Sequence, residues 1–331
     1  MPVLAKIGSI LHERYRIERI IGQGGYGCIY LAEDLRLSGR YCAVKQVTYD
    51  PSLPANLLNE SREQFLREAT VLARLDHPNL PKVSDYFSIS DADYLVMDYV
   101  PGDDLRTLVA KASQKDEFLD EADVLDWARQ IGDALEYLHN QQPPIVHRDI
   151  KPSNIKLTPT GLVKLVDFGL VKLLAPGEVT ITILQGQGTA IYTPLEQYGG
   201  DSLHTDNRAD IYAFGATLYH LLTNQTPVNV RDRFLDPDNL SNPRSLNPAI
   251  SPRVEEAVLW AMELHPDDRP GDVHTFMKAL TGESTGRLHN GISSSNGSAR
   301  HARVGEAERR LIAVASSLAF LSLLLTILHD F

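Results

Sequence analysis

The chain changes its hydrophobic pattern about a hundred residues from its start, and this change limits the folds it can adopt. The segments Arg14–Gly22, Cys28–Asp34 and Tyr41–Val47 are short, rich in branched and aromatic residues, and separated by turns that contain glycine. This pattern predicts an antiparallel sheet. Beyond Gly102, apolar residues instead recur at helical spacing. The segments with this spacing are 124–138, 210–222, 254–264 and 273–280. The sequence therefore predicts an α+β fold with a mostly β lobe and a mostly α lobe.

One helix is expected within the β-rich part. Ser61 and Gln64 have the spacing of a capping box, which marks the start of a helix. The apolar residues that follow at helical spacing are Phe65, Ala69, Leu72 and Ala73. We expect a helix that begins at Ser61 and packs this face against the sheet.

Composition narrows the possible functions. With 331 residues, 43% of them hydrophobic, the chain can bury a core in each lobe. A net charge of −11 argues against the broad basic face that nucleic acid would need. Cys28 and Cys42 are too few for a disulfide framework and lack metal-ligand spacing, so a reducing compartment is expected. We expect both to be free thiols at the surface, pointing away from Ile29 and Ala43 on their strands.

The first chemical motif is a glycine-rich turn between two predicted strands. Gly22, Gly24 and Gly27 form the pattern G-x-G-x-x-G, and Gly25 adds a further glycine. Such a turn lets backbone N–H groups approach phosphates closely. Because strands lie on both sides, a hairpin that covers phosphates fits better than the turn of a dinucleotide-binding fold. An ordinary glycine-rich hairpin is the alternative.

Lys45 lies in the middle of an apolar strand, where a charge is unfavourable unless a partner compensates it. Glu68 on the predicted helix is the expected partner, with Glu63 as the alternative. A lysine held in this way can reach phosphate oxygens. The alternative is a strand-edge lysine that extends into solvent.

Two short strands carry most of the remaining chemistry. The polar turn between Ile145 and Leu157 contains Asp149, Lys151 and Asn154, and a second strand ends at Asp167, with the hairpin turn at 158–161 between them. Together these residues offer a proton acceptor, a cation for phosphate and two oxygen ligands for a divalent metal. Their convergence in one hairpin predicts a phosphoryl-transfer site.

These motifs, in this order and spacing, resemble those of eukaryotic-like (Hanks-type) protein serine/threonine kinases, bacterial members above all. The resemblance covers Tyr15 to about Leu280. It implies the bilobal kinase fold over 15–281, with an N-terminal lobe at 15–97, a hinge at 98–104 and a C-terminal lobe at 105–281. An N-terminal segment, 1–14, precedes the domain.

The resemblance also implies roles for the catalytic residues. Asp149 would be the catalytic base, Lys151 would stabilise the transferred phosphoryl group, and Lys45 with Glu68 would form the activating ion pair. Asn154 and Asp167 would bind Mg²⁺, or Mn²⁺. His147 and Asp210 would be structural, with Asp210 bracing the catalytic turn.

The same resemblance implies an ATP site between the lobes. Its glycine loop would comprise Gly22, Gly24, Gly25 and Gly27. Ile29 and Ala43 would cover the adenine from above. Met97 would be the gatekeeper, the backbone of Asp98 and Val100 would face the adenine edge, and Asp104 would be placed for the ribose.

An activation segment is implied between Leu170 and Glu196. Thr189 in "GTAIYTPLE", together with Lys151, favours serine and threonine as acceptors. Pro194-Leu195 departs from the Ala-Pro of the family, and Glu196 is expected to pair with Arg269. Arg148 beside the catalytic aspartate implies control by phosphorylation of the segment, with Thr180 and Thr182 as candidates.

The C-terminal part differs in composition from the rest. Residues 282–308 are rich in Gly and Ser and predict a flexible linker. Residues 309–328 are predicted to span a membrane, because Leu311 to Leu328 carries no charge and a helix of this length reaches about 27 Å. Residues 329–331 form a short tail. Arginines before the span predict a cytoplasmic domain, and the chain's start does not resemble a secretory signal.

We therefore expect a membrane-anchored enzyme that uses MgATP to phosphorylate serine or threonine in proteins, including its own activation segment in a transient homodimer. Protein substrates and lipid are the expected partners, and nucleic acid is not. Two alternatives remain: a pseudokinase that acts as a membrane scaffold, and a phosphotransferase for small molecules.

Overall fold

The computed structural model describes residues 4–24, 27–49, 52, 54–167, 172–173, 190–198 and 206–282. They belong to one compact unit, which extends from residue 1 to 284. Residues 283–308 of the predicted linker, the span and the tail lie outside the described residues, as do Gly25, Thr180, Thr182 and Thr189.

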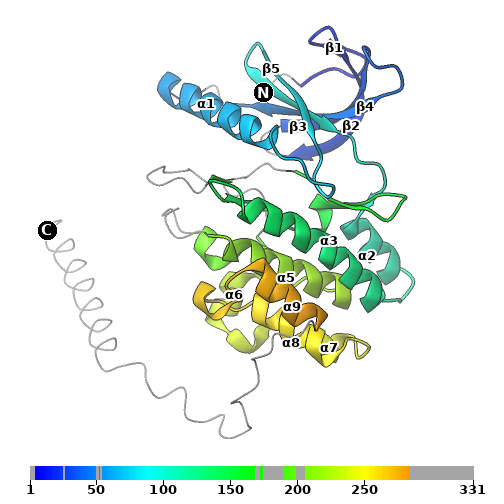
Figure 1. The fold of residues 1–331 in the computed structure, drawn as a ribbon, viewed down its shortest axis with the longest axis vertical. Helices are drawn as coiled ribbons and strands as arrows, with labels where there is room; N and C mark the ends of the chain where they lie inside the picture. Colours follow the sequence, from blue (N-terminus) through cyan, green and yellow to red (C-terminus); the bar gives the residue numbers. More distant parts are fainter. Residues whose placement is uncertain are drawn as a thin grey trace, which may run out of the picture. The chain divides into compact units, whose positions relative to one another are not determined.

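A six-stranded antiparallel sheet forms the first lobe, as the sequence predicts (Figure 1). The strand order is β1-β2-β3-β4-β6-β5. The strands are β1 (Ile10–Leu11), β2 (Tyr15–Gly24), β3 (Gly27–Asp34), β4 (Tyr41–Thr48), β5 (Val83–Ile89) and β6 (Ala92–Asp98). Neighbours in sequence mostly pair as hairpins, so the register follows from short local connections.

Helix α1 (Ala55–Leu72) follows β4 and starts earlier than predicted. The predicted start at Ser61 is wrong, because Pro54 occupies the N-cap and Ser61 lies inside the helix. The Ser61 hydroxyl donates to the Leu57 carbonyl one turn earlier, a bond that serine commonly forms within helices. The predicted face is confirmed for Ala69 and Leu72, which are buried, and for Phe65, which packs against the same core. Ala73, also predicted on this face, is the C-cap of the helix and is exposed.

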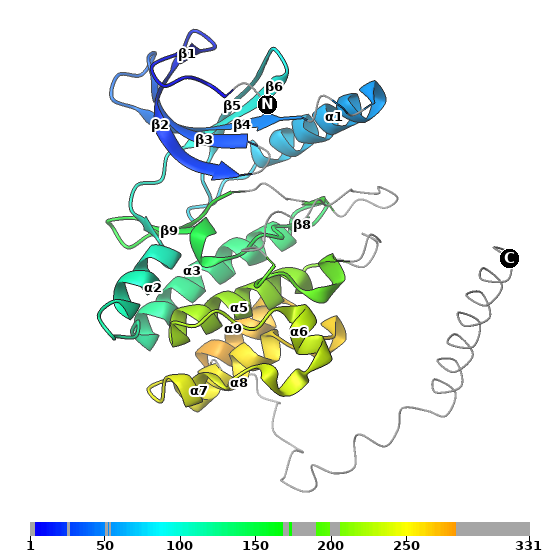
Figure 2. The same cartoon turned by 180° about the vertical axis from the view of Figure 1, so that it is seen from behind.

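Helices form the second lobe, which lies below the sheet in Figures 1 and 2. They are α2 (Leu105–Ser113), α3 (Glu121–His139), α5 (Arg208–Thr223), α6 (Val230–Leu235), α7 (Pro243–Leu246), α8 (Pro252–Ala261) and α9 (Val273–Thr281). The predicted stripe of α3 is buried throughout. Helix α5 is buried along almost its whole length, and it packs against α3 and α8. It is thus the central helix of the lobe.

Short strands and turns outside the six-stranded sheet position the site. The 3-10 turn η1 (Pro152–Asn154) leads into β9 (Ile155–Leu157), which pairs with β10 (Val163–Leu165) and β7 (Asp103–Asp104). Strand β8 (Ile145–Val146) pairs with β11 (Lys172–Leu173). The predicted hairpin is confirmed. Its turn closes with a hydrogen bond from the Thr158 N–H to the Leu162 carbonyl.

The two faces of the sheet pack into different cores. Ala43, Leu95 and Met97 face α1 and the helical lobe. Alternate residues on the opposite face form a second core with the chain's N-terminal residues, including Tyr15. Cys28 and Cys42 belong to this second core and are each 1% exposed. They point away from Ala43 as expected, but the prediction of surface thiols is wrong because the N-terminal segment covers this face.

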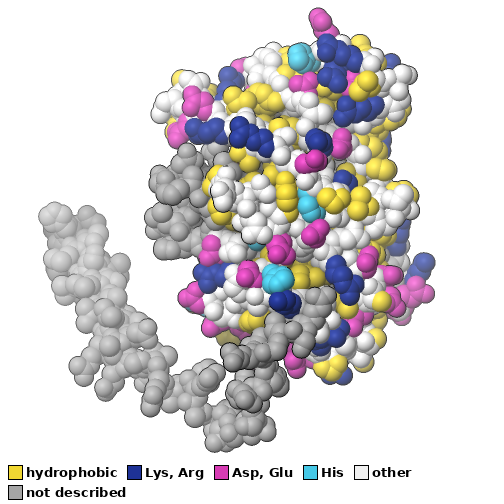
Figure 3. All heavy atoms as spheres, in the orientation of Figure 1, with side chains coloured by type: hydrophobic (Ala, Val, Ile, Leu, Met, Phe, Trp, Pro, Cys, Tyr) yellow, Lys and Arg dark blue, Asp and Glu magenta, His cyan; other side chains and the backbone are white. Residues whose placement is uncertain are grey.

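The surface of the unit mixes charges of both signs with small apolar areas between them, as the visible face in Figure 3 shows. Among the described helices, none combines the length and the apolar composition that crossing a bilayer requires. The predicted span, 309–328, is not among them.

Candidate active site

The catalytic turn places its polar side chains around one carboxylate. Oδ2 of Asp149 accepts hydrogen bonds from Lys151 Nζ and Asn154 Nδ2, both at 2.8 Å. Asn154 Nδ2 also donates to the Asp149 carbonyl at 2.9 Å. Oδ1 of Asp149 is buried and forms no hydrogen bond with a described residue. A buried acceptor without a partner is unfavourable, so this oxygen is suited to accept a proton from an incoming hydroxyl group.

Helix α5 holds the turn through Asp210, which is fully buried. Its carboxylate accepts hydrogen bonds from the backbone N–H groups of His147, at 2.8 Å, and Arg148, at 2.7 Å. His139 Nε2 lies 2.8 Å from the same carboxylate. Burial alone would raise the pKa of Asp210, but these hydrogen bonds and the nearby histidines hold it below its ordinary value. The bracing contact that the sequence suggested is therefore present.

Asp167 lies where β10 leads back into the site. The Val166 N–H donates to the Asn154 carbonyl at 2.8 Å, which brings the end of this strand against the catalytic turn. Asp167 has a φ of 66° and Arg148 a φ of 68°, a left-handed conformation that residues with a side chain seldom adopt. Such backbone strain clusters at functional sites.

Lys45 contacts Asp167 rather than Glu68 in this structure. Lys45 Nζ lies 2.5 Å from Asp167 Oδ1, and this ammonium group is the main reason that the pKa of Asp167 lies below its ordinary value. Glu68 instead accepts a hydrogen bond from Gln64 at 3.1 Å. Among the described residues, neither Glu68 nor Glu63 forms an ion pair with Lys45. The expected Lys45–Glu68 pair is thus replaced, because the carboxylate of Asp167 lies closer.

The Glu68 carboxyl group still interacts with the charges of the site. Burial raises the pKa of its carboxyl to about 7, although the Gln64 hydrogen bond and the charges of Lys45 and Arg148 act in the opposite direction. A carboxyl group with this pKa is partly neutral at neutral pH. The charged form is favoured both by the hydrogen bond from Gln64 and by the positive charge of Lys45.

The donor set fits a magnesium ion that is shared with phosphates. Within the described residues, no cluster of three or more His, Cys, Asp or Glu side chains could hold a metal on its own. Asn154 directs its amide nitrogen at Asp149, which leaves its Oδ1 for another partner. Asp167 keeps a charged carboxylate beside it. One carboxylate and one amide oxygen suit Mg²⁺, which completes its shell with water and phosphate oxygens.

The proposed nucleotide residues share one face of the sheet. Ile29 pairs with Lys45, and Ala43 pairs with Met97, so these four side chains point toward the helical lobe. Gly27 requires a residue without a side chain, because a Cβ there would lie 1.8 Å from the Gln46 carbonyl oxygen. Gly22 and Gly24 end the neighbouring strand β2.

The hinge leads directly into α2. Val100 is buried, and the Asp98 N–H donates to the Lys82 carbonyl at 3.0 Å. Asp104, expected near the ribose, has a structural contact as well: its Oδ1 accepts from the Thr107 N–H at 2.8 Å and caps α2. This cap uses one carboxylate oxygen and leaves the other for a ligand.

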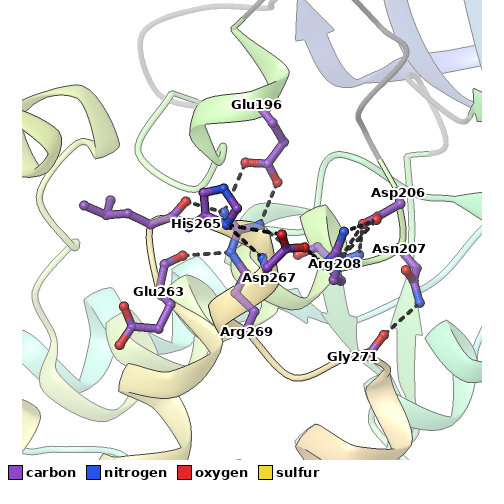
Figure 4. A network of polar contacts seen from close by, with 10 residues as sticks. Glu196, Asp206, Asn207, Arg208, Glu263, His265, Asp267, Arg269 and Gly271 are labelled. Carbon is purple, nitrogen blue, oxygen red and sulfur yellow. Dashed lines mark hydrogen bonds and ion pairs between the residues drawn. The ribbon is translucent and has the colours of Figure 1, made fainter. Parts of the chain in front are cut away.

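The end of the activation segment is attached to the helical lobe by a two-pronged ion pair. Arg269 donates to both oxygens of Glu196, at 2.6 and 3.1 Å (Figure 4). The Arg269 side chain is fully buried. Nearby, Arg208 bridges Asp206 and Asp267. The expected pair therefore forms despite the substitution Pro194-Leu195.

A buried pair of residues beside this segment was not predicted. The Tyr192 hydroxyl lies 2.6 Å from His220 Nδ1, and burial lowers the pKa of His220 to about 4. On the same helix, Thr217 contacts the Ile150 carbonyl at 3.4 Å. The helical spacing of Asp210, Thr217 and His220 was the available signal. One face of α5 thus holds both the catalytic turn and the segment that contains Tyr192.

Two lobes joined by a hinge, with this carboxylate, lysine and amide arrangement between them, define a protein kinase domain. The protein kinase domain family model matches residues 15–280, and the chain belongs to this family. A probable serine/threonine-protein kinase of Clostridium acetobutylicum is 34% identical over 83% of this chain and 40% of its own length. PrkC of Bacillus subtilis, a serine/threonine-protein kinase, is 33% identical over 82% and 42%.

Solved kinase domains have the same fold as this chain. The kinase domain of Mycobacterium tuberculosis PknI is 27% identical, with a TM-score of 0.61, and the match covers 85% of this chain and all of that domain. The chain spans less than half the length of the two curated relatives described above. The similarity therefore concerns their kinase domains.

Proposed function

We propose that the chain is a protein serine/threonine kinase that transfers the γ-phosphoryl group of ATP to Ser or Thr hydroxyls of proteins. The observation that carries this proposal is the Asp149 carboxylate: Lys151 and Asn154 fix Oδ2, while Oδ1 has no partner among the described residues. A fixed acceptor beside a lysine is what in-line phosphoryl transfer to a hydroxyl requires. The kinases named above support the serine/threonine class.

The chain's own residues supply positioning and charge. Asp149 would orient the acceptor hydroxyl and accept its proton, and Lys151 would attract the oxygens of the transferred group. Lys45 would bind the other phosphates after it leaves Asp167. Asn154 and Asp167 would hold Mg²⁺, which neutralises developing charge on the phosphate oxygens. Ile29, Ala43 and Met97 would face the adenine, because they belong to the apolar cluster on the side of the sheet that faces the helical lobe.

Substitution of Asp149 by Asn tests the assignment. It keeps the side chain's size but removes the proton acceptor, and we expect phosphate transfer from radiolabelled ATP to myelin basic protein to fall at least a hundredfold. Nucleotide binding, measured with a fluorescent ATP analogue, should remain. Equal transfer by both proteins would refute the role, and a protein-free screen of phosphate acceptors would detect a small-molecule phosphotransferase.

We also propose that the enzyme phosphorylates its own activation segment at Thr180 or Thr182. Arg148 supports this, because burial lowers its pKa and makes a nearby phosphate favourable. The double variant Thr180→Ala, Thr182→Ala should lose most of its autophosphorylation and activity. Mass spectrometry that finds neither site modified in the active enzyme would exclude these residues.

We further propose that residues 309–328 anchor the kinase to a membrane, with the catalytic domain in the cytoplasm. The support is the uncharged stretch from Leu311 to Leu328 and the arginines that precede it.

A further inference from the structure

Strand β9 carries a lysine that the proposed mechanism does not use. Lys156 is the central residue of β9, between Ile155 and Leu157. Ile155 is fully buried in the core, whereas Lys156 is partly exposed. Because successive side chains of a strand point to opposite faces, Lys156 points to the face of β9 that Ile155 does not occupy.

The strands beside β9 show where this face is directed. Lys156 pairs with Lys164 on β10 and with Asp104 on β7, and paired residues point to the same face. Lys164 Nζ donates to the Leu80 carbonyl at 3.0 Å. Leu80 belongs to the connection between α1 and β5 in the first lobe. Lys156 therefore points toward the first lobe, and Figure 2 shows β9 between the sheet and the helices.

Strand β9 also lies directly against the hinge. A Cβ atom at Gly102 would lie 2.0 Å from the Leu157 carbonyl oxygen, and Gly102 has a φ of 104°. Only glycine allows the hinge backbone to approach the strand this closely. The adenine edge is expected at the hinge residues Asp98 and Val100. Lys156, next to Leu157, is thus placed beside the expected nucleotide site.

The ammonium group of Lys156 is available to a ligand. Lys156 forms neither an ion pair nor a hydrogen bond with a residue that the structure describes. Asp104 uses Oδ1 to accept from the backbone and hydroxyl of Thr107, which leaves Oδ2 for another donor. Cross-strand neighbours have Cβ atoms about 5 Å apart. A donor and an acceptor therefore lie side by side on one face of this small sheet.

A nucleoside fits these groups. A ribose hydroxyl both donates and accepts hydrogen bonds, so adjacent hydroxyls can engage a carboxylate and an ammonium group together. Hydrogen bonds to charged groups are the stronger ones. The methylene stem of a lysine is apolar. The stem of Lys156 can therefore pack under the base, on the side opposite the apolar face of Ile29, Ala43 and Met97.

We propose that Lys156 is a specificity-determining residue of the nucleotide site. Its methylene groups pack below the base, and its ammonium group donates to a ribose hydroxyl beside the Asp104 carboxylate. The inference rests on the proposed function for the identity of the nucleotide, but the binding itself requires no phosphate transfer. It predicts that the ammonium group and the ribose hydroxyls contribute jointly to affinity.

Calorimetric titration of the full chain with ADP, 2′-deoxy-ADP and 3′-deoxy-ADP, each with Mg²⁺, tests this coupling. The diphosphates carry no γ-phosphoryl group to transfer. We expect the wild-type protein to bind ADP at least fivefold more tightly than one of the deoxy nucleotides. Lys156→Met keeps the length of the stem but removes the charge, and it should reduce this preference at least threefold. Lys156→Arg keeps a donor and should retain the preference.

A matched control removes a neighbouring charge. Lys111 pairs with Asp103, and Lys111→Met should leave all three affinities unchanged. Lys156→Gln also removes the charge and gives the same comparison if methionine destabilises the fold. A preference that Lys156→Met leaves unchanged, an equal loss for all three nucleotides, or the same loss in Lys111→Met overturns the proposal.

Binding and phosphate transfer separate this inference from the proposed function. If the wild-type protein binds no ADP, the nucleotide site of the proposed function and this inference both fail. If the preference falls in Lys156→Met but the wild-type protein phosphorylates no acceptor, the kinase proposal fails while the role of Lys156 stands. Phosphate transfer together with an unchanged preference overturns only the role of Lys156.

Discussion

The Glu68 carboxyl group is expected to lower the stability of the fold when it is charged, yet to be needed for activity. Glu68 is a half-buried residue of α1 with a pKa near 7, and its hydrogen bond comes from Gln64, whereas Lys45 contacts Asp167. The sequence predicted Glu68 as the partner of Lys45, but it could not predict which carboxylate Lys45 contacts in this structure. That choice depends on distances of a few ångströms between two lobes, and residue spacing does not contain them.

The pH dependence of stability follows from this raised pKa. In the unfolded chain Glu68 ionises near its ordinary pKa of 4.5, and in the folded chain near 7. Its contribution is fully present below pH 4.5 and is lost as pH rises to 7. Glu68→Gln should therefore be more stable than wild type at pH 8 by about 2 kcal/mol, after allowance for screening by solvent, yet less active.

Urea unfolding at pH 5 and pH 8 measures this effect. Glu63→Gln is the matched control, because Glu63 is exposed on the same helix and should change neither stability nor activity. A Glu68→Gln protein with the wild-type pH profile would show that the carboxyl group is not shifted.

At the scale of elements, helix caps and helix faces determine where the site residues lie. The periodicity of α3, α5, α8 and α9 was sufficient to predict these helices, because apolar spacing follows directly from the helical repeat. The start of α1 was predicted wrongly, since Ser61 and Gln64 match a capping box but hydrogen-bond within the helix instead. A local motif cannot reveal which of its alternative hydrogen bonds the tertiary structure selects.

Asp104 caps α2 and is also expected to contact the ribose, and two substitutions separate these roles. Asp104→Ala removes the N-cap of α2 and should cost about 1 kcal/mol of unfolding free energy, whereas Asp104→Ser keeps a capping oxygen and most of the stability. If Asp104 also binds the ribose, KM for ATP should rise severalfold in both variants. A KM that rises only in Asp104→Ala would assign the residue to the cap alone.

At the scale of the whole molecule, the sequence predicted two lobes, their order and the hairpin that carries the chemistry. These features depend on composition and periodicity, which the sequence contains in full. It did not predict that the N-terminal residues cover the outer face of the sheet, because residues 4–11 show no strong pattern of their own. Their packing depends on a surface formed by strands far along the chain.

The proposed membrane attachment is tested on the whole chain. Deletion of residues 309–331 should move the protein from the membrane pellet to the soluble fraction, because it removes the uncharged stretch. Deletion of 329–331 alone leaves that stretch intact and should leave the protein in the pellet. An unchanged distribution after the longer deletion would exclude this anchor.

The second core has a practical consequence. The chain contains no cysteines other than Cys28 and Cys42, and burial raises the pKa of the Cys42 thiol to about 11, so maleimide reagents should label the native protein slowly. A cysteine introduced on each lobe could then carry a spectroscopic probe without removal of the natural ones. The relative motion of the lobes would become measurable in an otherwise unaltered enzyme.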